Sequence, residues 1–246
     1  MAEWWPSASH SGHAYSPLWF QTFLQDVDPA ITNREVAFVQ RRMPPASHPR
    51  VLDLCCGPGR HLGPLAAAGY EVTGLDIDAV PLMDSRARAH AVVRGDMRRL
   101  PFRDGALDGV VCFWQSFGYF DDTTNRTVLA EVARVLRPGG IAILDVYHRL
   151  YYERARGERT LEHSGLRIIE RRSMHGDRLH VSLRYEDASN GRQVGSDDFE
   201  WRVYTPRELM AEAHRVGLLE KLSCSGFDET SMAGPDVPRM QLVFLR

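Results

Sequence analysis

Lysine is almost absent from this chain of 246 residues: of its 30 basic residues, 29 are arginine and one is lysine, Lys221. Enzymes that form a Schiff base need a reactive lysine, and phosphate-binding loops that end in Gly-Lys-Ser/Thr need one after a glycine-rich segment. Lys221 lies near the C-terminus, and no glycine-rich loop precedes it. The sequence therefore argues against both kinds of site.

Cysteine, net charge and long apolar runs are also scarce. The four cysteines show no zinc-binding or redox spacing, so no metal is expected and a reducing cytoplasm is favoured. The formal net charge of -2 gives no electrostatic reason to expect a nucleic acid or a membrane as partner. No apolar run approaches about 18 residues, and the N-terminus does not resemble a signal peptide. We expect a cytoplasmic monomer or homodimer whose partner is a small molecule.

Strand-like and helix-like segments alternate from about residue 31 to 147. The first helix is predicted behind a capping box, Thr32-x-x-Glu35, and a later one at about 79–90. Short apolar runs predict buried parallel strands at 50–54, 71–76, 91–93, 107–113 and 141–146. Repeated strand–helix units predict an α/β fold, a Rossmann-like doubly wound sheet with helices on both faces.

The pattern changes between about 148 and 203. Apolar and polar residues alternate from Leu179 to Tyr185, and the turn residues Ser189-Asn190-Gly191 follow, which predicts antiparallel strands with one wet face. The helical pattern resumes at Thr205-Pro206-Arg207-Glu208, a capping box with proline at the first helical position. We predict four parts: an N-terminal extension or lid at 1–30, a core at 31–147, an antiparallel insertion covering the pocket at 148–203, and the C-terminal part of the core at 204–246.

A glycine turn joins the first predicted strand to a helix, in the run Asp53-Leu54-Cys55-Cys56-Gly57-Pro58-Gly59. Glycines there let the backbone approach a ligand at the helix N-terminus. The glycine after this run is Gly63, so the dinucleotide spacing Gly-x-Gly-x-x-Gly is absent, which argues against a nicotinamide dehydrogenase. Carboxylates also end the next two strands. Asp76 can accept from both ribose hydroxyls, while Asp96 can accept from an exocyclic amine and the Met97 N–H can donate to a ring nitrogen.

The glycine turn, the carboxylates that end the next strands and the motifs that follow them occur in the same order as in the class I S-adenosylmethionine-dependent methyltransferases, which this chain resembles. The resemblance covers about residues 51–218 and is carried by the segments 51–61, 74–78, 95–97, 134–140 and 204–209. It implies S-adenosylmethionine as the cofactor and a seven-stranded sheet whose last strand is antiparallel. The residues expected at the cofactor are Asp53, Cys55, Gly57, Gly59, Asp76, Ile77, Asp96, Met97 and Phe113, with Tyr15 as a lid contact. Cys55 departs from the family's loop, which has its first glycine there.

The segment after the fourth strand, Phe113–Phe120, bears on the acceptor. Methyltransferases of this fold that act on nucleic-acid amines carry Asn/Asp-Pro-Pro-aromatic there, and cytosine-C5 enzymes carry Pro-Cys; this chain has neither. The segment instead resembles small-molecule methyltransferases with Ser-Phe-Gly-Tyr-Phe and an antiparallel insertion after the fifth strand. Its aromatic residues can line a substrate pocket or pack in the core. The candidates for the pocket are Trp114, Phe117 and Tyr119 of this segment, together with Tyr151 of the insertion.

His148 directly follows the fifth strand and, with Tyr147, is the candidate catalytic residue. A histidine there can act as a general base toward an amine or hydroxyl, or it can be a solvated loop residue, because methyl transfer depends largely on proximity and orientation. We predict transfer of a methyl group to nitrogen or oxygen of a small molecule. Two alternatives stay open: a cyclase or isomerase that keeps the cofactor's methyl group, and a non-catalytic cofactor-binding protein.

Overall fold

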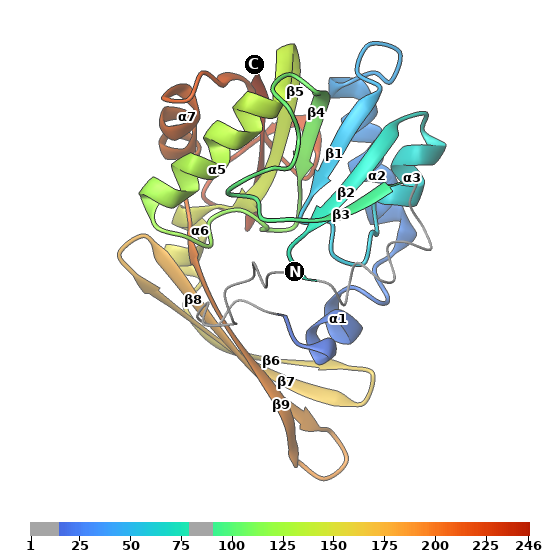
Figure 1. Ribbon diagram of the computed structural model, residues 1–246. Helices are drawn as coiled ribbons and strands as arrows, with labels where there is room; N and C mark the ends of the chain where they lie inside the picture. The colour runs from blue at the N-terminus through green and yellow to red at the C-terminus, as the bar shows by residue number, and fades with distance from the viewer. Residues whose placement is uncertain (1–14, 79–90) are drawn as a thin grey trace, which may run out of the picture. The chain divides into compact units, whose positions relative to one another are not determined.

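The computed structural model describes residues 15–78 and 91–246, so the helix expected at 79–90 lies outside the described residues. The chain divides into two compact units (Figure 1). The large unit comprises Val27–Ala155 and Trp201–Arg246, and the small unit comprises the N-terminal segment up to Asp26 together with Arg156–Glu200.

The large unit is built on an eight-stranded sheet in the order β11-β10-β12-β5-β4-β1-β2-β3. Its strands are β1 (Arg50–Leu54), β2 (Glu71–Asp76), β3 (Ala91–Arg94), β4 (Leu107–Cys112), β5 (Leu136–Tyr147), β10 (Leu219–Ser225), β11 (Asp228–Met232) and β12 (Arg239–Leu245). The strands β1 to β5 pair with one another in parallel, and β12 runs antiparallel between β5 and β10. The predicted Rossmann-like α/β fold with an antiparallel last strand is confirmed.

The sheet has one strand more than the seven expected. β11 pairs antiparallel with β10, and the turn between them has Gly226 and Phe227 at φ of 65° and 58°. The sequence of β11, Asp-Glu-Thr-Ser-Met, contains no apolar run, and Met232 is 85% exposed. Backbone pairing with β10, rather than burial of a side-chain face, therefore holds this edge strand, and apolar patterning cannot predict it.

Helices cover both faces of the large sheet. The helices described in the large unit are α2 (Pro29–Arg42), α3 (Leu62–Ala67), α5 (Asp122–Val135), α6 (Arg149–Arg154) and α7 (Pro206–His214). Successive strand residues point to opposite faces, so two hydrophobic clusters form. Val110 and Leu144 belong to the cluster that includes buried residues of α5 and α7, whereas Val111 and Ile143 belong to the one that includes α2 and α3. Figure 1 shows the two helix pairs on opposite sides of the sheet.

Side-chain caps begin the helices α5 and α7. Asp121 accepts a hydrogen bond from the Thr124 backbone N at 2.7 Å. Thr205 Oγ1 accepts from the Glu208 backbone N at 3.3 Å, and the Glu208 carboxylate accepts from the Thr205 backbone N at 2.8 Å. The capping box predicted at Thr205–Glu208 is therefore confirmed.

The capping box predicted at Thr32 and Glu35 is wrong. α2 begins three residues earlier at Pro29, where the Asp28 side chain accepts from the Ala30 backbone N at 2.8 Å. Proline at the first helical position and aspartate before it together form a stronger start signal. Thr32 and Glu35 instead lie inside the helix and are buried, at 6% and 1% exposure. Both are therefore free to bond with groups outside α2.

The described part of the small unit contains an antiparallel sheet and one short helix. Its elements are α1 (Pro17–Phe23), β6 (Gly157–His163), β7 (Leu166–His175), β8 (Arg178–Asp187) and β9 (Gln193–Arg202), whose last two residues belong to the large unit. Leu179, Val181, Leu183 and Tyr185 of β8 are buried and the residues that alternate with them are more exposed, so the predicted period-two alternation is present. Asp197 of β9 ties α1 to this sheet. It accepts from the backbone N and Oγ of Ser16, at 3.0 and 2.7 Å.

Candidate active site

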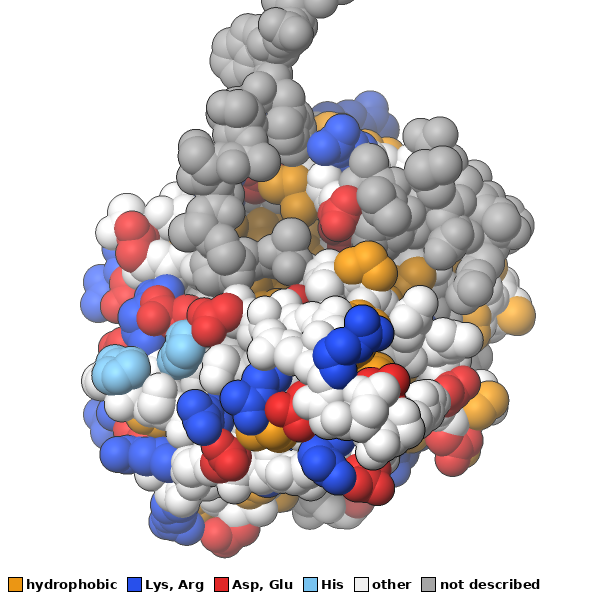
Figure 2. All heavy atoms as spheres, turned by 90° about the horizontal axis from the view of Figure 1, so that it is seen from below, with side chains coloured by type: hydrophobic (Ala, Val, Ile, Leu, Met, Phe, Trp, Pro, Cys, Tyr) orange, Lys and Arg blue, Asp and Glu red, His pale blue; other side chains and the backbone are white. Residues whose placement is uncertain are grey.

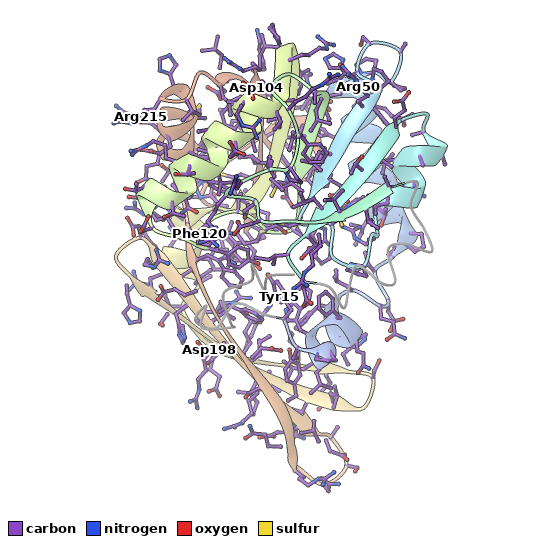
Figure 3. The ribbon with its side chains drawn as sticks, in the orientation of Figure 1. Tyr15, Arg50, Asp104, Phe120, Asp198 and Arg215 are labelled. Atoms are coloured by element: carbon purple, nitrogen blue, oxygen red, sulfur yellow. The ribbon has the colours of Figure 1, made fainter. Side chains whose placement is uncertain are left out.

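The glycine turn follows β1 at the carboxyl ends of the parallel strands. In Figure 3 this end of the sheet is marked by Phe120, and the opposite end by Arg50, the first residue of β1. Cys55, Gly57 and Gly59 have φ of 62°, 52° and 79°. This left-handed conformation favours glycine, which gives a physical reason for the glycine that the family has at the position of Cys55. Cys55 adopts this left-handed conformation although it is not a glycine.

Asp53 lies in β1, just before the glycine turn, and is 2% exposed. Its Oδ2 atom has no hydrogen-bond partner among the described residues, and His61 Nδ1 lies 4.0 Å from it. Burial raises the pKa of Asp53 to about 6, although the nearby charges of His61 and Arg60 lower it. Asp53 is thus a buried carboxyl group with one oxygen that can accept a hydrogen bond from a ligand.

Asp76, the last residue of β2, lies against the glycine turn. Its Oδ2 accepts from the Gly57 backbone N at 2.9 Å, and its Oδ1 accepts from the Asp78 backbone N at 3.0 Å. Burial raises the pKa of Asp76, while these two backbone N–H groups lower it. Ile77, the next residue, is a large apolar side chain with 47% exposure. The structure therefore brings Asp76, Gly57 and an exposed apolar surface together.

Asp96 and Met97 follow β3. Arg98 forms a bidentate pair with the Asp96 carboxylate: its Nε donates to Oδ1 at 3.0 Å and its Nη2 donates to Oδ2 at 2.5 Å. The Arg98 guanidinium lies 4.9 Å from the ring centroid of Phe120. A ligand amine at Asp96 would share this carboxylate with Arg98, which the sequence pattern does not indicate. Met97 is buried, and its Sδ lies 4.0 Å from Cys55 Sγ, beside the glycine turn.

Glu35 of α2 is a site residue that the sequence analysis missed. Its Oε1 accepts from the Trp114 Nε1 at 2.8 Å, and its Oε2 lies 2.7 Å from Arg60 Nη1 and 2.8 Å from His61 Nε2. Burial raises the pKa of Glu35, but hydrogen bonds and charges of His61 and Arg60 outweigh it and lower the pKa to about 2. The sequence signal was available: Thr32 and Glu35 share the buried helical face of the apolar residues around them.

Trp114 and Gln115, directly after β4, both have positive φ, at 56° and 59°. The Trp114 backbone N donates to Asp145 Oδ2 at 2.9 Å, and Asp145, fully buried in β5, also pairs with Arg239. The guanidinium carbons of Arg60 and Arg239 lie 4.6 and 5.0 Å from the indole centroid. The local strain and these partners hold the indole beside two cations.

Two of the predicted aromatic residues are core residues. Phe113, expected at the cofactor, is 4% exposed and packs edge-on against His61 and Phe227, with centroid distances of 5.1 and 5.4 Å. Phe117, expected in the substrate pocket, is 1% exposed and packs against Tyr204 at 5.8 Å. The placement of Phe117 agrees with the alternative of core packing that the sequence left open, and the contact of Phe113 with the cofactor stays a prediction.

Other aromatic residues of the large unit form an aromatic cluster near the carboxyl ends of β4 and β5. It consists of Tyr119, Tyr147, Tyr151, Tyr152 and Trp201. Tyr147 contacts Tyr152 at 4.8 Å and Trp201 at 5.5 Å, while Tyr119 lies 6.2 Å from Trp201 and Tyr151 lies 5.1 Å from Tyr152. Tyr119, Tyr147 and Tyr151 are partly exposed, so the structure brings together three of the predicted site residues.

His148 is 2% exposed, so the alternative of a solvated loop histidine is wrong. Its backbone N donates to the Pro238 carbonyl at 3.0 Å, and it forms a β-bridge with Tyr204. Its Nδ1 is buried and has no hydrogen-bond partner among the described residues. Burial lowers the pKa of His148, so the imidazole is neutral at neutral pH and can accept a proton.

Tyr15 belongs to the small unit. Its ring lies 4.1 Å from that of Trp19 and 4.7 Å from that of Phe199. Both neighbours are residues of the same unit. The contact of Tyr15 with the cofactor stays a prediction.

Other kinds of site find no support in the described residues. Within 15–78 and 91–246, no group of three or more His, Cys, Asp or Glu residues is arranged to hold a metal ion, and the four cysteines are free. Figure 2 shows basic and acidic side chains interleaved among the described residues of the face seen there. In the described part of the chain, no helix has the length and apolar character needed to cross a membrane.

Comparison with known proteins finds a family match for the segment that contains the glycine turn and the carboxyl ends of β1, β2, β3 and β4. Residues 51–140 match the family model of a methyltransferase domain. The matched segment contains the glycine turn, Asp76, Asp96 and the residues that follow β4. This segment of the chain is similar to a methyltransferase domain.

Curated relatives match this chain over part of their length. A demethylmenaquinone methyltransferase of Beutenbergia cavernae is 39% identical over 93 residues, which cover 37% of this chain and 38% of that protein. The chain spans about two fifths of the length of the first curated relatives that it matches.

Solved structures match nearly the whole chain in fold. An S-adenosylmethionine-dependent methyltransferase from Clostridium acetobutylicum has a TM-score of 0.78 at 14% identity, covering 93% of this chain and 96% of that one. The sugar N-methyltransferase KedS8 from Streptoalloteichus has a TM-score of 0.72 at 20% identity, covering 100% and 98%. At 14% and 20% identity, these two structures confirm the predicted fold. The match of residues 51–140 to a methyltransferase domain supports the predicted enzyme class, and the Ser-Phe-Gly-Tyr-Phe subgroup stays a prediction.

Proposed function

We propose that this protein transfers a methyl group from S-adenosylmethionine to a nitrogen or oxygen atom of a small molecule. One observation carries the proposal: Asp53, Asp76 and Asp96 lie at or just beyond the carboxyl ends of the adjacent strands β1, β2 and β3, around a glycine turn. Ligands of open α/β sheets bind at this edge. The match of residues 51–140 to a methyltransferase domain supports the same conclusion.

The residues at this edge fit the cofactor. The Asp53 Oδ2 atom, which lacks a partner among the described residues, would accept from the ammonium of the methionine part. Asp76 would hold the ribose hydroxyls, and the exposed Ile77 would cover the adenine with apolar surface. Gly57 and Gly59 leave the backbone open to close approach by a ligand.

The chain's own contribution to the reaction is orientation and proton removal. When bound, S-adenosylmethionine would supply a methyl group on a positively charged sulfur. The thioether is the leaving group, and it needs no acid catalysis. The aromatic cluster, including Tyr147, presents ring faces that orient an acceptor and suit a developing positive charge. His148 Nδ1 then accepts the proton that an N–H or O–H acceptor loses.

An amine is the first acceptor to test, because the similar fold of KedS8 belongs to a sugar N-methyltransferase. The protein is incubated with S-adenosylmethionine and separate pools of amines, amino sugars and phenols, and S-adenosylhomocysteine is quantified by mass spectrometry. Formation of S-adenosylhomocysteine above the acceptor-free control supports methyl transfer. Conversion of an acceptor without it indicates the cyclase or isomerase, and tight binding with no turnover in any pool indicates a cofactor-binding protein.

Several further expectations remain predictions. The N-terminal extension at 1–30 and the insertion at 148–203 would select the substrate and exclude water. The cytoplasmic location, the monomeric or homodimeric state and the lack of a nucleic-acid partner also stay predictions. Light scattering on the purified protein measures the oligomeric state directly.

A further inference from the structure

Two charged side-chain atoms near the glycine turn are buried and have no hydrogen-bond partner among the described residues: Asp53 Oδ2 and Arg60 Nη2. The other terminal nitrogen of Arg60 is satisfied. Its Nη1 lies 2.7 Å from Glu35 Oε2 and donates to Thr32 Oγ1 at 2.6 Å. A buried charged group that lacks a partner is costly, and sites of this kind are commonly completed by a ligand.

The two atoms carry opposite charges and flank the same turn. Asp53, which lies in β1, precedes the glycines, and Arg60 directly follows Gly59. They lie close enough for the positive charge of Arg60 to lower the pKa of Asp53. An α-amino acid presents an ammonium and a carboxylate on one carbon, so this pair of atoms is complementary to that group.

We propose that Arg60 binds the carboxylate of the methionine part of S-adenosylmethionine through Nη2, while Asp53 accepts from the ammonium of the same group. The inference rests on the proposed function and adds to it a residue for the carboxylate. The amino-acid part of the ligand is thereby held at both of its charged ends, on the two sides of the glycine turn.

Arg60 is preorganised for this role. Its side chain is 14% exposed, and its guanidinium carbon lies 4.6 Å from the Trp114 ring centroid. Glu35 and Thr32 fix Nη1, so little side-chain entropy is lost when Nη2 binds a ligand. A lysine cannot reproduce the arrangement, because a single ammonium does not provide two nitrogens in a rigid fork. Glu35 is accordingly a positioning residue that acts through Arg60.

The test compares three ligands by titration calorimetry on wild type and Arg60→Met. S-adenosylhomocysteine has the ammonium and the carboxylate, decarboxylated S-adenosylmethionine has only the ammonium, and 5′-methylthioadenosine has neither. We expect Arg60→Met to weaken S-adenosylhomocysteine binding by about 10- to 100-fold, the effect of one hydrogen-bonded ion pair. The two ligands without a carboxylate should keep their affinity within about threefold. Arg60→Lys should recover only part of the loss.

Arg134→Met is the matched control, because Arg134 also pairs with acidic residues but contacts Asp104, at the other end of the sheet (Figure 3). It should leave all three affinities unchanged. Equal losses for all three ligands in Arg60→Met, or an unchanged affinity for S-adenosylhomocysteine, would overturn the assignment while leaving the proposed function intact. Failure of the wild type to bind any of the three ligands would instead contradict the proposed function itself.

Discussion

The indole Nε1 of Trp114 donates a hydrogen bond to Oε1 of Glu35 at 2.8 Å, across 79 residues of sequence. Glu35 lies in the interior of α2, and Trp114 is the second residue after β4. The other oxygen of the same carboxylate faces Arg60 and His61, which follow the glycine turn. One ionised group thus links α2, the residues that follow the glycine turn and the segment after β4.

Replacing Glu35 with glutamine should weaken both stability and cofactor binding. The amide keeps an oxygen for the Trp114 indole but removes the negative charge opposite Arg60, so we expect a loss of about 1 to 3 kcal/mol in unfolding free energy. Displacement of Arg60 should also weaken the binding of S-adenosylhomocysteine more than the binding of 5′-methylthioadenosine. Urea unfolding and calorimetry measure the two effects. Glu131→Gln, which also removes a partner from an arginine, Arg134, should affect stability alone; equal ligand effects in both variants would contradict the role of Glu35.

Asp53 should make cofactor affinity depend on pH. Its pKa in the folded protein, about 6, lies above the usual 3.8 of an aspartate, so the folded state binds this proton more tightly than the unfolded state. The stability contributed by the protonated form is present below about pH 4 and is lost as pH rises to about 6, by about 2 to 3 kcal/mol in all. A ligand ammonium favours the ionised form. S-adenosylhomocysteine affinity should therefore rise as pH increases through about 6.

Asp53→Asn is the variant that isolates this titration. It should bind S-adenosylhomocysteine more weakly than wild type at neutral pH, with an affinity nearly constant across the window around pH 6. It should also be more stable than wild type at neutral pH, because no charge is buried. Calorimetry and thermal melting over this pH range measure both. A wild-type affinity that does not change through this window would remove Asp53 from the ligand site.

Asp197 should hold α1 in place within the small unit. It is 8% exposed and accepts from the backbone N and Oγ of Ser16 and from the Tyr185 hydroxyl at 2.8 Å. Asp197→Asn removes the charge that strengthens these three bonds, so we expect local stability to fall by about 1 to 3 kcal/mol. Hydrogen exchange of the amides in Pro17–Phe23 should accelerate accordingly. Asp198→Asn, a neighbouring side chain with 66% exposure, serves as control and should leave those amides unchanged.

The parallel part of the fold was predictable because each of its strands is a short apolar run, and a carboxylate follows at the same sheet edge. Asp53, Asp76 and Asp96 were found in this way. The pairing of Asp96 with Arg98 was not predicted, because two charges that lie two positions apart in sequence do not indicate whether their side chains bond or face solvent.

Glu35 illustrates a second limit of prediction from sequence. The pattern Thr-x-x-Glu has the same letters in a capping box as in a helix interior, and only the partners at the glycine turn and after β4 distinguish the two. Those partners are brought close by the tertiary fold rather than by sequence spacing. The edge strand β11 was missed for a related reason, since its pairing depends on the backbone of β10.

His148 should act on the proton of the acceptor rather than on its binding. Its buried Nδ1 lacks a partner among the described residues, and burial lowers its pKa, so the neutral imidazole is the form present at neutral pH. For the acceptor found in the pools, His148→Ala should lower kcat by about 100-fold or more, the typical contribution of a general base, with little change in KM. The wild-type rate should fall as pH decreases through the lowered pKa, and the variant should lose this dependence.

His214→Ala, an exposed histidine of α7, is the control and should keep the wild-type profile. A His148→Ala profile that matches wild type would show that orientation alone suffices for transfer.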